Sequence, residues 1–154
     1  MSSLEARVAQ LENIEAIRAL KVHYARLCDD GYAADPLAAL FTQDCLWDGG
    51  IMGSYEGREA VRRFFGAATV RVRFALHMMV SHTIDIAPSG TEASGYWYLW
   101  QPMTLDGVAH LSAVTYDDEY RKVDGSWLFH RVKVNRHFTA PYDKGWVKQR
   151  LPVG

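Results

Sequence analysis

The first thirty residues carry the pattern of an amphipathic helix. From Ser2 to Asp30, apolar residues recur at steps of three and four, the period of a helix that buries one stripe. Ser2 or Ser3 can cap its start, and Gly31 permits the turn that ends it. We expect one long helix that spans a layer of the fold. The expected buried stripe is Leu4, Val8, Leu11, Ile14, Ile17, Leu20, Tyr24, Leu27 and Cys28.

Shorter elements follow, and then the pattern changes to that of strands. Two short helices are expected after Asp35 and over residues 58–65, with a brief strand at residues 45–47 between them. Four runs rich in Val, Ile, Thr and aromatic residues come next, and short turn signals, two of them Asp-Gly, separate them. Strands joined by such turns are antiparallel neighbours. These runs are residues 73–86, 92–104, 108–122 and 127–138.

Helices followed by an antiparallel meander predict one α+β domain over residues 1–154. In this fold, three N-terminal helices close one side of a strongly curved antiparallel sheet, shaped as a half-open cone. The formal net charge of -1 gives no reason to expect nucleic acid as a partner. No run approaches the roughly 18 apolar residues of a membrane span, and the start does not resemble a signal peptide. We therefore expect a cytoplasmic protein without a membrane partner.

The end of the first helix offers the first candidate chemistry. Asp29 and Asp30 lie at the negative end of the helix dipole, which raises the pKa of a carboxyl toward that of a general base. In the last strand, Arg136 alternates onto an otherwise largely apolar face with residues 128, 130, 132, 134 and 138. A buried arginine requires a partner, either Asp29 or an oxyanion of a substrate. A pair with Asp29 that only holds the helix to the sheet is the structural alternative.

Several phrases carry a resemblance to a known family. The phrases IEAIRALKVHYARLCDDGY, ALFTQDCLWDGG, YEGREAVRRFF and YDDEYRKVDGSWLFHRVKVNRHF resemble the SnoaL-like branch of the nuclear transport factor 2-like superfamily. The chain is most similar to bile acid 7α-dehydratases, hexachlorocyclohexane dehydrochlorinases and scytalone dehydratases. The resemblance implies a cone-shaped α+β fold in which an aspartate and a histidine eliminate water or HCl, without metal or organic cofactor.

The resemblance also assigns catalytic residues. The family's tyrosine lies five residues before its aspartate, which matches Tyr24 and Asp29, although Asp30 can also take the acid's role. The family's histidine begins a phrase like His-Met-x-x-His, which matches His77. The family's arginine lies nine residues after a tryptophan, which matches Arg136 after Trp127. Strict strand alternation would turn His77 outward, unless the open cone exposes that side or a bulge shifts the register.

Five further residues are expected to contact the substrate: Asp30, Trp47, Tyr98, Gln101 and His82. Gln101 stands where the bile acid dehydratases carry an acidic residue, so the same substrate and proton relay are not implied. Tyr98 shares a strand face with Tyr96 and Trp100, which can line an apolar pocket or pack in the core or an interface. Asp117, Asp118 and Glu119 are expected at a solvated strand edge.

The expected function is that of a cofactor-independent lyase or isomerase that acts on a small, mostly apolar cyclic substrate in the cone. The histidines lack metal-ligand spacing, so no metal site is expected. The alternative is a non-catalytic ligand-binding domain, or an assembly domain like the small subunits of ring-hydroxylating dioxygenases. Because such cones expose an aromatic sheet face, a homodimer or homotrimer is expected.

Overall fold

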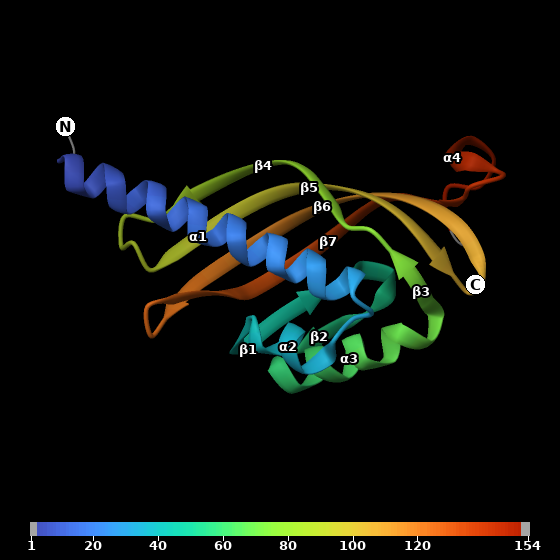
Figure 1. Cartoon of the computed structure of the whole chain (residues 1–154), viewed down its shortest axis with the longest axis horizontal. Helices are drawn as coiled ribbons and strands as arrows, with labels where there is room; N and C mark the ends of the chain where they lie inside the picture. The colour runs from blue at the N-terminus through green and yellow to red at the C-terminus, as the bar shows by residue number, and fades with distance from the viewer. Residues whose placement is uncertain (1–2, 152–154) are drawn as a thin grey trace.

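The computed structural model describes residues 3–151 and confirms the α+β fold (Figure 1). Its strands form one seven-stranded sheet in the order β2-β1-β7-β6-β5-β3, and β4 also pairs with β5. The helices are α1 (Leu4–Asp29), α2 (Ala34–Ala39), the 3-10 helix η1 (Gly50–Met52), α3 (Arg58–Arg71) and α4 (Gly145–Lys148). The strands are β1 (Phe41–Asp48), β2 (Ser54–Glu56), β3 (Val72–Ala75), β4 (Met78–Ile86), β5 (Glu92–Leu105), β6 (Val108–Val123) and β7 (Ser126–Pro141).

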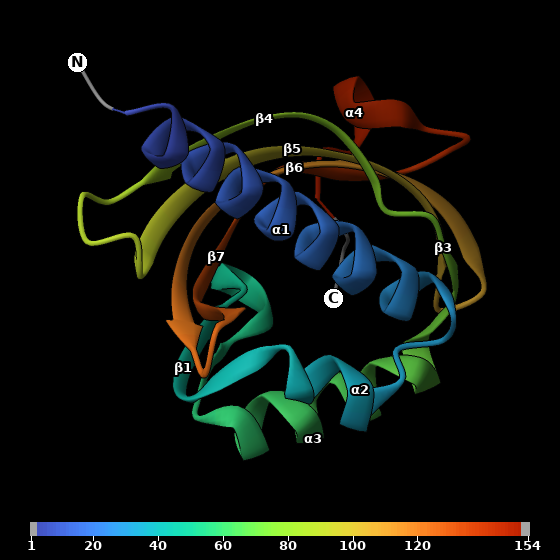
Figure 2. The ribbon, with the colours of Figure 1, turned by 60° about the vertical axis from the view of Figure 1, so that its left-hand side comes forward.

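The sheet is strongly curved, and α1 lies across its concave side (Figure 2). α2 and α3 lie beside each other near the C-terminal end of α1, so the three helices close the same side. The hydrophobic core fills the space between these helices and the concave face. The expected cone is confirmed. Within the described residues, 3–151, no helix is long and apolar enough to cross a membrane.

Two tight hairpins build the central part of the sheet. Asp106 and Gly107 connect β5 to β6 with φ angles of 49° and 80°, and Asp124 and Gly125 connect β6 to β7 with 48° and 81°. Two successive positive φ angles define the turn whose twist suits a two-residue hairpin. The sheet is nevertheless mixed, because β1 pairs parallel to β7. This corrects the expectation of a purely antiparallel sheet.

The first turns of α1 do not contact the core. Leu4, Val8 and Leu11 are 72%, 45% and 65% exposed, and burial along the helix begins at Ile17. Figure 1 shows the reason, since the N-terminal part of α1 projects past the end of the sheet. Ser3 caps the helix, and its hydroxyl accepts a hydrogen bond from the Ala6 N–H at 3.2 Å. The expected stripe is therefore buried only along the second half of α1.

Bulges change which residues face the concave side. In β7, register shifts opposite residues 113/114 and 119/120 interrupt the alternation that the sequence predicts. As a result Val132, Val134 and Arg136 share the inner face as expected, but residues 128, 130 and 138 do not. Phe129 and Trp127 are the buried residues at the start of the strand. In β4 a register shift lies between Met79 and Ser81, which leaves Val80 as the extra residue.

Candidate active site

The end of α1 and the start of β4 bring an aspartate and a histidine together. The Oδ1 atom of Asp29 lies 2.6 Å from Nδ1 of His77 and accepts a second hydrogen bond, of 2.8 Å, from the backbone N–H of His77. The His77 side chain is 5% exposed and that of Asp29 is 25% exposed. Two bonds to one oxygen fix both the backbone and the ring, so this dyad is rigid and largely shielded from solvent.

The bulge at Val80 explains why His77 faces the interior. His77 lies in the two-residue connection between β3 and β4, beyond the bulge. Met79, on the same side of the bulge, packs against the core, whereas Ser81 and Thr83 are exposed. The bulge therefore divides the polar strand face, on which strict alternation places His77, into two parts. The part that contains His77 points inward, which is the outcome that the sequence allowed if a bulge shifted the register.

The structure distinguishes the two carboxylates at the end of α1. Asp29 is the last residue of the helix and contacts His77. Asp30 is the C-cap, its N–H donates to the Arg26 carbonyl, and the residue is exposed. Asp30 does not join the dyad, so the expectation that it contacts the substrate there is not supported by its position.

Gln101 of β5 contacts the other side of the imidazole. Its Nε2 atom lies 3.0 Å from Nε2 of His77, and the residue is 7% exposed. Because Nδ1 faces a carboxylate, we place the ring proton on Nδ1 and the lone pair on Nε2, where the Gln101 amide donates. The structure thus joins Gln101, His77 and Asp29 in one hydrogen-bonded chain.

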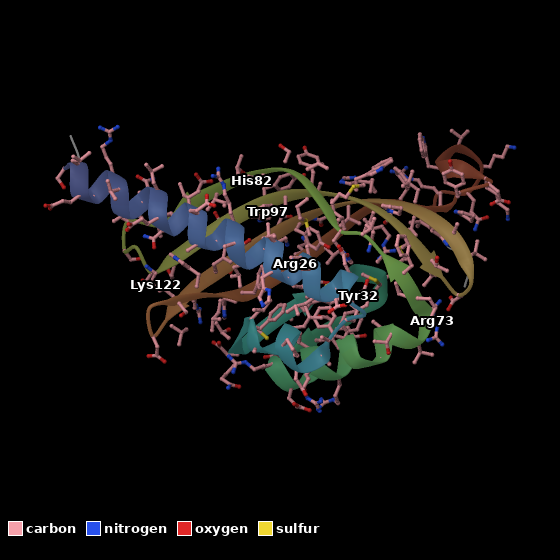
Figure 3. All side chains as sticks on the ribbon, viewed as in Figure 1. Arg26, Tyr32, Arg73, His82, Trp97 and Lys122 are labelled. Carbon is pink, nitrogen blue, oxygen red and sulfur yellow. The ribbon has the colours of Figure 1, made fainter. Side chains whose placement is uncertain are left out.

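Tyr32 belongs to the site, although the sequence did not single it out. It follows Gly31 in the turn after α1 and has a φ angle of 55°, which is uncommon for a bulky residue. Its ring packs edge-on against the His77 ring, with centroids 6.0 Å apart (labelled in Figure 3). Burial raises the pKa of its phenol and the Asp29 charge adds to this, whereas the Gln101 side chain and the Arg136 charge lower it.

Two more tyrosines and a tryptophan lie in the interior. Tyr24 is 2% exposed and packs against phenylalanine rings from β1, α3 and β7. Burial raises the pKa of the Tyr24 phenol. Trp47 is 3% exposed and packs on Phe64. Its indole N–H is buried without a hydrogen-bond partner among residues 3–151.

Arg136 reaches the interior from β7 but does not contact Asp29. Its guanidinium donates to Thr139 Oγ1 at 2.9 Å and to Met52 Sδ at 2.8 Å. Its Nε is buried without a partner within the described part of the chain. Burial lowers the pKa of Arg136, which Tyr116 and Tyr32 partly offset. Of the two partners considered for Arg136, Asp29 is therefore not in contact with it, and the cation lies beside a hydroxyl and a thioether.

Two expected site residues lie elsewhere. His82 accepts a 2.8 Å hydrogen bond from Arg18 and stacks on Trp97, with centroids 4.5 Å apart. Figure 3 shows His82 and Trp97 together near the middle of the sheet and apart from Tyr32. Tyr98 lies on the convex face and is 48% exposed. The structure brings neither residue to the dyad, because α1 and the sheet separate these positions.

A buried ion pair lies deeper in the cone. Lys21 Nζ is 2.6 Å from Asp118 Oδ2, and both side chains are 0% exposed. Tyr120 donates to the same oxygen at 2.8 Å, and its own oxygen accepts from the Trp97 indole at 2.9 Å. Asp118 is therefore not at a solvated edge, as expected from the sequence, whereas Asp117 and Glu119 are exposed.

Two surface cavities lie away from the dyad. One, of about 360 Å³, lies on the outer side of the sheet between Thr83, Tyr96 and Lys133. The other, of about 350 Å³, is lined by residues that include Ala87, Arg121 and His130. Neither includes Asp29 or His77. Within residues 3–151, no group of three or more His, Cys, Asp or Glu side chains is placed to hold a metal ion.

Comparisons with known proteins agree with this architecture. A proposed scytalone dehydratase from Novosphingobium aromaticivorans superposes with a TM-score of 0.81 at 25% identity, over 96% of this chain and 97% of that chain. Hexachlorocyclohexane dehydrochlorinase LinA-type3 from Novosphingobium barchaimii has a TM-score of 0.80 at 19% identity, over 96% and 99%. The SnoaL-like domain model matches residues 9–133. The chain therefore belongs to the SnoaL-like family.

Proposed function

We propose that the chain is a cofactor-independent lyase or isomerase that acts on a small, mostly apolar cyclic substrate. The observation that carries this proposal is the shielded Asp29–His77 dyad, in which a carboxylate holds one ring nitrogen and directs the other into the interior. Two solved structures of the same fold bear the names of a dehydratase and a dehydrochlorinase, and this supports elimination as the reaction class.

The dyad acts as a general base. When a substrate displaces the Gln101 amide from Nε2 of His77, this nitrogen takes a proton from a substrate carbon next to an activating group, and the C–H electron pair forms the new double bond. In elimination, the leaving group departs with its bonding electrons. In isomerisation, the imidazolium returns its proton at another carbon. Asp29 stabilises the imidazolium, and positioned general-base catalysis of this kind contributes roughly a hundred- to ten-thousand-fold.

Negative charge that develops on the substrate requires donors. Arg136 is suited to this role because its guanidinium carries a positive charge that no nearby carboxylate neutralises within residues 3–151. The Tyr24 hydroxyl is a second candidate donor, and Trp47 supplies an indole N–H that has no acceptor among residues 3–151. Substrate oxygens are the natural acceptors for these groups.

The test is turnover of a panel of cyclic alcohols, cyclic halides and unsaturated cyclic ketones, followed by NMR. We expect Asp29→Asn and His77→Ala to lower turnover at least a hundredfold, and Arg136→Ala to lower it as well. Asp30→Asn is the matched control, because it removes the neighbouring carboxylate, which is exposed. Activity of folded Asp29→Asn and His77→Ala equal to that of Asp30→Asn would refute the proposal. Panel compounds that bind near His77 but stay unchanged would favour the ligand-binding alternative.

We also propose that the chain forms a homodimer or homotrimer through the convex face of the sheet. Exposed apolar side chains gather on and beside this face, with exposures between 42% and 64%, and large apolar patches mark interaction sites. The patch comprises Phe74, Leu76, Met78, Val80 and Tyr98.

A cytoplasmic location is also part of the proposal. Both cysteines are free and buried, as expected in a reducing compartment such as the cytoplasm.

A further inference from the structure

Arg136 carries a partly buried guanidinium of which one whole edge lacks a good acceptor. Its Nη1 donates to Thr139 Oγ1 at 2.9 Å and its Nη2 to Met52 Sδ at 2.8 Å, and its buried Nε has no partner among residues 3–151. We propose that this edge is a carboxylate subsite, so that the substrate of the dyad is a small cyclic carboxylate. This inference deepens the proposed function and rests on it, because it names the substrate class.

The shape of the guanidinium determines which anion fits. The Nε–H bond and one Nη2–H bond point to the same side and form a fork that matches the two oxygens of a carboxylate. In Arg136 this fork consists of the unpaired Nε and of the Nη2 that faces sulfur. A thioether is only a weak acceptor. Nη1, which lies outside the fork, already has the Thr139 hydroxyl.

The surroundings of the cation favour an anionic ligand. Burial lowers the pKa of Arg136, so the interior opposes its charge. Its partners in the described part of the chain are a hydroxyl and a thioether, and neither carries a compensating charge. A carboxylate would supply that charge through two charge-assisted hydrogen bonds. Negative charge that develops next to a bound carboxylate spreads onto its oxygens, where the same guanidinium stabilises it.

Met52 lies where the fork would bind the anion. It ends the 3-10 helix η1, in a loop closed by a 2.9 Å hydrogen bond from the Gly49 N–H to the Gly53 carbonyl. The Tyr55 hydroxyl donates to the Met52 carbonyl at 2.9 Å, so the backbone of the loop is held. The side chain itself has three rotatable bonds. The thioether can therefore leave the guanidinium while the loop stays folded, and an entering carboxylate replaces a weak acceptor with a strong one.

A second buried donor without an acceptor borders the same loop. The indole N–H of Trp47 has no partner within residues 3–151. Gly49 lies so close to this ring that an added Cβ would overlap it, and that Cβ would also lie 3.0 Å from Cβ of Met52. Trp47 is therefore adjacent to the loop that carries the thioether. Buried polar groups normally have partners, so two unused donors beside one loop indicate ligand oxygens.

The sheet connects this subsite to the dyad through an apolar surface. One row of paired residues crosses the sheet from β7 to β4, and it consists of Arg136, Val114, Leu99 and Met79. Met79 follows His77 by two residues. Three strand spacings of roughly 4.8 Å separate the ends of the row along the curved sheet (Figure 2). Val114 and Leu99 are buried. A ring held by its carboxylate at Arg136 would thus extend over apolar side chains toward the base.

The experiment compares carboxylates with their neutral amides as ligands of the full chain at pH 7. The probes are cyclohex-1-ene-1-carboxylate and benzoate, and cyclohex-1-ene-1-carboxamide and benzamide are their neutral counterparts. Binding is followed through the arginine Nε–H signals in ¹⁵N NMR spectra. We expect the carboxylates to shift the Arg136 signal and to bind about tenfold more tightly than the amides, because charge-assisted hydrogen bonds are the stronger ones.

Two substitutions with matched controls test the fork. Arg136→Lys keeps the positive charge but removes the fork, so it should weaken carboxylate binding about tenfold. Arg131→Lys makes the same change at an exposed position of the same strand and should have no effect. Met52→Gln offers the guanidinium a stronger acceptor than sulfur, so it should also weaken binding about tenfold. Ile51→Gln introduces the same amide one residue earlier, on an exposed side chain, and should not.

Several results would overturn the inference. Amides that bind as tightly as the carboxylates would do so, and so would carboxylates that do not bind at millimolar concentration. If folded Arg136→Lys binds the carboxylates like Arg131→Lys, the inference is wrong. If Arg136→Lys does not fold, Met52→Gln decides, because affinities equal to those of Ile51→Gln equally exclude the fork as the subsite.

The binding test and the turnover test fail separately. Turnover of the neutral panel compounds without carboxylate binding refutes the subsite and leaves the proposed function standing. Carboxylate binding by a chain that converts neither the panel nor hydroxylated or halogenated cyclohexanecarboxylates refutes the proposed chemistry, while the subsite remains.

Discussion

The buried pair of Lys21 and Asp118 predicts a large asymmetry between single and double substitutions. Asp118→Asn leaves the Lys21 ammonium without a counter-ion in a site where both side chains are fully buried. Breaking such a pair costs about 3–5 kcal/mol, whereas replacing both partners with apolar residues is often neutral or stabilising. We expect the first result for Asp118→Asn and the second for Lys21→Met/Asp118→Leu.

The structure supports the upper part of that range. The 2.6 Å contact is complemented by the Tyr120 hydroxyl on Asp118, and the Lys21 cation lies 3.7 Å from the centre of the Tyr116 ring. Burial lowers the pKa of Lys21 and raises that of Asp118, which shows that desolvation opposes both charges. Total stabilities of domains are only about 5–15 kcal/mol, so the loss would be a large share.

The assay is urea unfolding at pH 7, followed by tryptophan fluorescence. Asp118→Asn should lower the unfolding midpoint without a change in the m-value. Asp117→Asn is the control, because it makes the same change one residue earlier on an exposed side chain, and it should stay within about 0.5 kcal/mol. Equal stability of the two asparagine variants would refute the reasoning. A double variant as unstable as Asp118→Asn would show that the pair is not the source of the cost.

Two further predictions concern His82 and the convex face. Burial, and then the Arg18 charge, lowers the pKa of His82 in the folded protein below its usual 6.5. The neutral imidazole therefore contributes stability above pH 6.5, and this contribution is lost as the pH falls through the pKa of the folded state. Arg18→Gln should raise that pKa in an NMR titration and reduce the loss of stability between pH 7 and pH 5; an unchanged pKa would contradict this. Tyr98→Lys should shift native mass spectra from oligomer to monomer, whereas the exposed α1 change Val22→Lys should not. A Tyr98→Lys protein that assembles normally would exclude this face as the interface.

The strands could be predicted because their signals are local. The Asp-Gly pairs at residues 106–107 and 124–125 determine their own turns, and the hairpins follow. Asp29 and His77 were found through the resemblance, and the structure adds the contact between them. The parallel pairing of β1 with β7 was not predictable, because it joins segments about ninety residues apart and β1 lacks an alternating pattern.

The buried ion pair of Lys21 could have been predicted from the sequence. The buried positions of α1 include Ile17, Lys21, Tyr24 and Cys28, so the lysine lies on the predicted stripe itself. A charge on a buried stripe demands a partner from another element, and Asp118 supplies it. No comparable signal in the sequence points to Tyr32, because its position depends on its own left-handed backbone conformation, which no residue pattern predicts.

The extra residue in β4 has a consequence for how related chains are aligned. The resemblance implies a phrase like His-Met-x-x-His, whereas here His77 and His82 are separated by one residue more. Val80 absorbs that insertion at the border of the sheet, where β4 has a single strand neighbour, so Met79 and Ser81 still pair with the consecutive residues Leu99 and Tyr98. A related chain that lacks this one residue can point its two histidines in the same directions as His77 and His82. In a sequence alignment, a gap placed anywhere else in the strand would pair at least one of these histidines with the wrong residue.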